Sequence, residues 1–96
     1  MRLGFGPEAH RNQAVAALGE SLEWMQKAVA RGMACHDRMI FVDRAFYFLS
    51  MAHTHLNSMV GKWEQTENDA AIIKQYGALR RSLRDIYDEF DQQCVK

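Results

Sequence analysis

The sequence has no net charge, no long apolar run and very little proline or cysteine. Twelve basic residues balance twelve acidic ones, so no long-range field attracts nucleic acid or acidic lipid. No apolar segment approaches the roughly 18 residues of a membrane-spanning helix, because Asp43 and Arg44 interrupt the richest one. We therefore predict a soluble protein that binds neither nucleic acid nor a membrane.

The chain has two cysteines, Cys35 and Cys94, and they follow no repeated spacing. So few cysteines fit a reducing compartment, and the N-terminal residues lack an apolar stretch of signal-peptide length. We therefore expect a cytoplasmic protein with free thiols. A Cys35–Cys94 disulfide is one alternative. Zinc binding by Cys35, His36 and Cys94 is a weaker one, because the spacing matches no local zinc motif.

The sequence also lacks the common motifs of catalytic sites. It has no glycine-rich phosphate loop, no Gly-x-Ser-x-Gly elbow and no His-Glu-x-x-His pair. No glutamate stands three residues before a histidine, which excludes a ferritin-like di-metal site. We predict a non-enzymatic protein with no catalytic residue, cofactor, metal site or small-molecule substrate.

A first helix is predicted over residues 7–31, after a flexible arm at residues 1–6. Pro7 suits the first turn of a helix because its missing N–H would be unpaired there in any case. Gly32 is a typical C-terminal stop. Apolar residues step by three and four between these two positions: Val15, Leu18, Leu22, Met25 and Val29.

The richest apolar segment spans residues 38–63. Seven residues recur there at alternating four- and three-residue steps: Val42, Phe46, Leu49, His53, Leu56, Val60 and Trp63. A second row lies beside them: Phe41, Ala45, Phe48, Ala52 and Met59. This spacing is typical of a long helix that is covered from more than one side.

Two histidines lie in this segment. His53 falls on the first row, and His55, two positions further, points about 160° away from it. They cannot bind one metal ion from one face. We interpret His53 as a partly buried histidine that is hydrogen-bonded across the fold, and His55 as a surface or interface residue.

The remaining pattern predicts how the second and third helices begin. Asp37 can cap a second helix over about residues 37–64. Thr66 and Asp69 nearly match a capping box, which predicts a third helix over about residues 67–94. Its apolar row begins at Ile72 or Ile73 and continues through Tyr76, Leu79, Leu83, Ile86 and Phe90.

Three helices with short links predict one all-α domain over residues 7–96, arranged as an up-down-up bundle. The alternative is an extended antiparallel hairpin of the first two helices, with the third helix packed on another chain. Periodicity does not separate these two arrangements.

Several aromatic and methionine side chains do not all fit on one row, and such side chains are typical anchors of protein interfaces. They are Trp24, Met33, Met39, Phe41, Tyr47 and Met51, and the flexible arm adds the apolar residues Leu3 and Phe5. We therefore predict a helical protein-protein interaction module that serves as a structural subunit or adaptor. Its partner is another protein or further copies of the same chain. The alternative is a small helical chaperone or inhibitor that binds one protein target reversibly.

Overall fold

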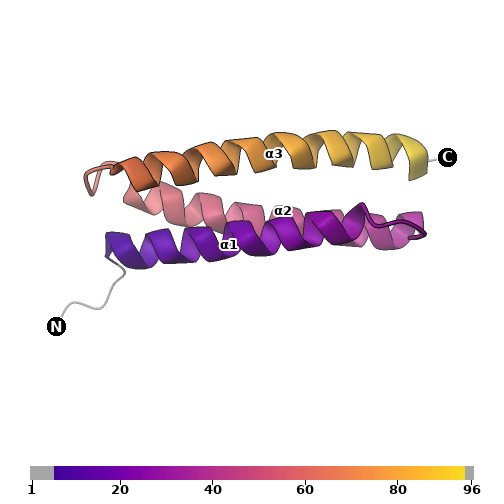
Figure 1. The fold of residues 1–96 in the computed structure, drawn as a ribbon, viewed down its shortest axis with the longest axis horizontal. Coiled ribbons are helices and arrows are strands. Elements are labelled where there is room, and N and C mark those ends of the chain that lie inside the picture. The colour runs from indigo at the N-terminus through magenta and orange to yellow at the C-terminus, as the bar shows by residue number, and fades with distance from the viewer. Residues whose placement is uncertain (1–5, 95–96) are drawn as a thin grey trace.

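The computed structural model describes residues 6–94, which form three helices and no strand. The helices are α1 (Pro7–Ala28), α2 (Cys35–Met59) and α3 (Glu67–Cys94). They lie side by side in an up-down-up arrangement, as Figure 1 shows. The shape is a rod of 54 × 25 × 19 Å. The predicted all-α bundle is confirmed, and α3 folds back on its own chain instead of swinging away.

The first helix begins where the sequence predicts. Gly6 is the N-cap residue and Pro7 occupies the first helical position. The helix ends at Ala28, three residues before the predicted end. The chain turns before the predicted stop signal, and Gly32 lies in the loop with a φ of 77°, which a residue with a side chain rarely adopts.

Both ends of α2 differ from the prediction. The helix begins at Cys35 after Ala34, which caps it without a side-chain hydrogen bond, so Asp37 lies in the first turn and is not the cap. It ends at Met59, five residues before the predicted end, because Val60 is extended and Gly61 has a φ of 77°. The start of α3 is as predicted. The Asp69 amide donates to the Thr66 hydroxyl (3.1 Å) and the Thr66 amide donates to the Asp69 carboxylate (3.0 Å).

The core follows the middle helix. Its buried apolar residues on α2 are Val42, Ala45, Leu49, Ala52, Leu56 and Met59. On α3, Ile72, Leu83 and Phe90 are buried while Ile73 is exposed, which resolves the alternative that the sequence left open. The first helix packs mainly against α2 and has its smallest contact with α3.

Candidate functional site

The side of α1 that faces α2 is built from small residues. Ala14, Ala17, Ser21 and Ala28 are buried there. The Ser21 hydroxyl donates a hydrogen bond of 2.7 Å to the backbone carbonyl of Ala45, which is itself fully buried on α2. Small side chains let two helix backbones approach closely. The backbones of α1 and α2 therefore lie close together, and the small side chains between them are shielded from solvent.

Of the larger apolar residues of α1, Leu18 is buried in the core and Met25 is half-buried against it, whereas others lie to one side of the contact with α2. Val15 is 50% exposed, Leu22 is 41% exposed, and Val29, just beyond the helix, is 48% exposed. The sequence places these three residues in one apolar row with Leu18 and Met25, and the structure buries only Leu18 fully and Met25 partly, so burial of the whole row is not observed. Small residues took the inward position because they allow the closer approach to α2.

Val15 and Leu22 border an open groove between α1 and α3, whereas Val29 does not line it. Its volume is about 510 Å³. The lining residues are Val15, Leu18, Gly19, Leu22, Met25, Gln75, Ala78, Leu79 and Ser82. None of them carries a charge, and the polar ones are limited to two amide or hydroxyl side chains at positions 75 and 82. Such a surface can bury apolar side chains, but it offers no group for acid, base or metal chemistry.

One end of the molecule holds a pair of histidines. The Nδ1 atoms of His10 on α1 and His55 on α2 are 3.0 Å apart, and the Trp63 ring lies 5.8 Å from the His10 ring. Burial, together with the charges of His55 and Lys62, lowers the pKa of His10. The prediction that His53 is partly buried is wrong. His53 is exposed, its ring stacks on Tyr76 of α3 with the ring centres 5.4 Å apart, and its side chain lies near the Asn57 amide of its own helix, whereas His55 is half-buried beside His10 of α1.

The same end carries an ion pair between α1 and α3. The Arg11 Nε–H donates to one oxygen of Asp69, and the Arg11 Nη2 donates to the other oxygen at 3.1 Å. The Asp69 side chain is buried. Hydrogen bonds from Arg11, and then from Thr66, lower its pKa to about 2 although burial opposes this shift. The start of α3 is thus fixed to α1 by a bidentate contact.

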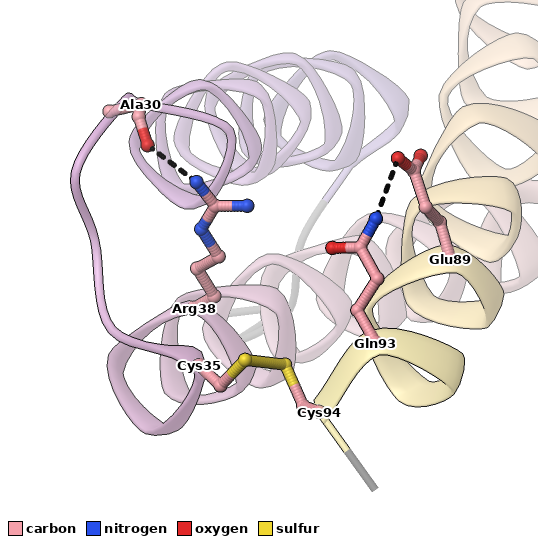
Figure 2. The surroundings of a disulfide bond; sticks show 6 residues. All are labelled: Ala30, Cys35, Arg38, Glu89, Gln93 and Cys94. Carbon is pink, nitrogen blue, oxygen red and sulfur yellow. Dashed lines mark hydrogen bonds between the residues drawn. A yellow bond between two sulfur atoms is a disulfide. The ribbon is translucent and has the colours of Figure 1, made fainter. Parts of the chain in front are cut away.

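A disulfide joins the other end of α3 to the start of α2. Figure 2 shows the bond between Cys35 and Cys94, whose Cα atoms are 5.5 Å apart. Next to it, Arg38 donates a hydrogen bond of 3.1 Å to the carbonyl of Ala30 in the preceding loop (Figure 2). The expectation of free thiols is therefore wrong. The zinc alternative is also wrong, because both thiolates that it required are used in the disulfide.

Two of the predicted interface residues contact each other across α1 and α2. The rings of Trp24 and Phe41 are 5.4 Å apart, and both residues are half-buried against the core. The Lys27 ammonium lies 4.4 Å from the centre of the Trp24 ring, and the Arg44 guanidinium lies 5.8 Å from it. Part of each aromatic surface is therefore used inside the chain.

The other predicted interface residues are dispersed. Met39 and Met51 are half-buried on the core, and Met33 is half-buried in the loop between α1 and α2. Tyr47 is 60% exposed. Leu3 and Phe5 lie outside the described residues. An interface at these positions stays a prediction, and the structure does not bring them together with the groove.

Sequence reasoning missed the groove between α1 and α3. The signal that could have revealed it is the second row on α1, in which small residues repeat at helical spacing: Ala14, Ala17, Ser21 and Ala28. Two rows of apolar residues on one helix indicate two contacts. The row of small residues forms the closer contact with α2, which leaves the larger apolar residues available for a second contact.

The rest of the described chain offers few other sites. Across residues 6–94, no three histidine, cysteine or acidic side chains are grouped as they would be to hold a metal ion. No helix in that range is long and apolar enough to cross a membrane. Compared with models of known protein families, with curated proteins and with solved structures, the chain matches none of them.

Proposed function

We propose that this protein is a non-enzymatic protein-protein interaction module, acting as a structural subunit or adaptor through the groove between α1 and α3. The single observation that carries the proposal is the row of half-exposed residues along this groove, Val15 and Leu22 above all. An open apolar surface rimmed by polar residues is typical of an interaction site.

The shape and chemistry of the groove favour a helical partner over a small molecule. A small-molecule site is concave and has a few converging polar groups that fix the ligand. This groove is open, and its lining is almost entirely apolar or small. A helix from another chain would complete a four-helix arrangement and cover both rims at once.

Each residue of the groove would contribute only modestly to the free energy of such docking. Full burial of a valine or leucine side chain contributes about 1.5–3 kcal/mol, so the half-exposed Val15 and Leu22 would each add about 1 kcal/mol when covered. Affinity therefore depends on the whole face and not on one anchor. A partner must cover the groove along much of α1.

A photo-reactive amino acid placed at Leu22 tests the proposal. In cells that produce the protein, we expect a discrete, heavier adduct from this position and none from the matched control at Glu20, which is exposed on the same helix but does not line the groove. Adding Val15→Glu should abolish the adduct. Equal adducts from both positions, or none from Leu22, would contradict the proposal.

The closed fold favours a second candidate, a small chaperone or inhibitor that binds one protein target reversibly. Because α3 is fixed at both ends by the Arg11–Asp69 ion pair and the Cys35–Cys94 bond, the chain has a core of its own without a partner. A reversible binder should purify as a stable monomer and gain mass only with its target. A constitutive subunit should associate on its own.

The cellular compartment also enters the proposal. The predicted cytoplasmic location was based on the small number of cysteines and on the lack of an apolar stretch of signal-peptide length among the N-terminal residues. Disulfides persist in oxidising compartments and are rare in the cytosol. The Cys35–Cys94 bond therefore leads us to favour an oxidising compartment over the cytoplasm.

A further inference from the structure

We infer that the groove between α1 and α3 is covered by a second copy of this chain, whose α1 lies antiparallel to the first about a two-fold axis at Leu22. The inference rests on the proposed function and names the partner. It follows from the order of residues along the rim, the neutrality of the groove and the charges at the two ends of α1.

The exposed row on α1 is symmetric about its centre. Val15 and Leu22 line the groove, and Val29, just beyond the end of the helix, continues their row at the same seven-residue spacing. Two identical helices in antiparallel orientation, with Leu22 against Leu22, bring Val15 of each copy against Val29 of the other. A two-fold interface needs this self-complementary order, since each contact occurs twice.

The lining of the groove suits a neutral apolar partner such as α1 itself. No charged side chain lines it, so it offers no counter-charge to an acidic or basic segment. The sides of the groove include three small residues that project little into it, Gly19, Ala78 and Ser82. The space beside Gly19 is open to at least 4 Å. Small residues at these positions allow a second helix to approach closely.

Charges at the ends of α1 favour the antiparallel orientation. Glu8 is exposed in the first turn, and Arg31 is exposed just beyond the last turn. Antiparallel pairing brings each glutamate toward the partner's arginine, and it also sets the helix dipoles in opposite directions. Parallel pairing would bring like charges together at both ends.

Cysteine crosslinking tests the inference. Both cysteines of the chain form the Cys35–Cys94 disulfide, so one added cysteine supplies a single free thiol. With a short bismaleimide, Leu22→Cys should give a species of twice the chain mass, because this residue meets itself at the axis. The matched control Glu20→Cys should stay at the mass of one chain. Circular dichroism confirms that both variants are folded.

A mixing experiment tests the orientation. Val15→Cys and Val29→Cys should each crosslink poorly alone, since about 21 Å of helix separates these positions in an antiparallel pair. A mixture of the two variants should crosslink strongly. Efficient crosslinking of Val15→Cys to itself would overturn the antiparallel arrangement.

The outcomes separate this inference from the proposed function. If Leu22→Cys crosslinks no better than Glu20→Cys, the second copy is overturned. A photo-adduct of Leu22 with a different protein would then leave the proposed function standing. If the photo-reactive residue at position 22 also gives no adduct, both proposals fail.

Discussion

The two sides of α1 meet their neighbours in opposite ways. Toward α2, alanine and serine side chains are fully buried, and the Ser21–Ala45 hydrogen bond links the two helices. Toward α3, the larger Val15 and Leu22 remain half exposed beside an open groove. On α1, the side with the small residues forms the contact that is completed within the chain and Leu18 at its border is buried as well, whereas the large residues further round the helix are left half exposed.

The third helix is held mainly at its ends and on its α2 side. The Arg11–Asp69 ion pair fixes its start and the Cys35–Cys94 bond fixes its end, while Leu83 is fully buried between them. The groove lies along the middle of α3, on the side toward α1. The chain thus keeps one long apolar edge uncovered while both ends of the helix are secured.

The largest expected effect comes from removing the disulfide. Cys35→Ser combined with Cys94→Ser should lower the free energy of unfolding by about 4 kcal/mol, because the bond closes a loop with a sequence separation of 59. Urea unfolding measures the loss. The wild-type chain under reducing conditions should match the variant. An unchanged unfolding midpoint would show that packing alone holds α3.

The same Ala→Leu substitution, made once in α2 and once in α3, compares the two helix surfaces that α1 faces. Ala45→Leu should lower the free energy of unfolding by about 1–3 kcal/mol, because the buried contact with α1 has no room for a larger side chain. Ala78→Leu, on the rim of the groove, should change it by less than about 0.5 kcal/mol. Urea unfolding at low chain concentration compares the two variants. Equal losses would mean that the two contacts are equally closed.

The Arg11–Asp69 pair predicts a pH dependence. The pKa of Asp69 is about 2 in the folded chain against an ordinary value of 3.8. Because the folded value is the lower one, the ion pair stabilises fully above about pH 4, and this stabilisation is lost as the pH falls toward 2. Asp69→Asn should remove this part of the pH profile in thermal unfolding. The exposed Asp85→Asn serves as control and should retain it.

The smallest expected effect concerns the buried serine. Ser21→Ala should lower the free energy of unfolding by about 1 kcal/mol, since the hydrogen bond to the Ala45 carbonyl is lost in a buried contact. Urea unfolding would detect it. Ser82→Ala, on the exposed rim, is the matched control and should leave stability unchanged. A greater loss at Ser82 would reverse the comparison.

Local sequence signals predicted much of the fold. Pro7 and the Thr66–Asp69 capping box marked two helix starts correctly, because capping depends on neighbouring residues. The end of α2 was predicted too late. Extended backbone at Val60 and the positive φ at Gly61 end it before the apolar pattern does.

The candidate site could not be predicted in the same way. On α1, two apolar rows compete for the core, and periodicity does not reveal which one α2 accepts. The pairing of Cys35 with Cys94 required the ends of two helices to meet, and the exposure of His53 followed from how α2 is rotated. These features depend on tertiary packing, to which a single sequence gives only indirect access.

The central claim is that α2 covers one side of α1 and that a second copy of the chain covers the groove on the other side. Light scattering across a concentration series tests this claim most directly. We expect the wild-type chain to approach twice its 11.1 kDa mass as concentration rises. Leu22→Glu should remain at the single-chain mass, whereas Glu20→Gln should behave as the wild type. A wild-type chain that stays at 11.1 kDa at every concentration would contradict the claim.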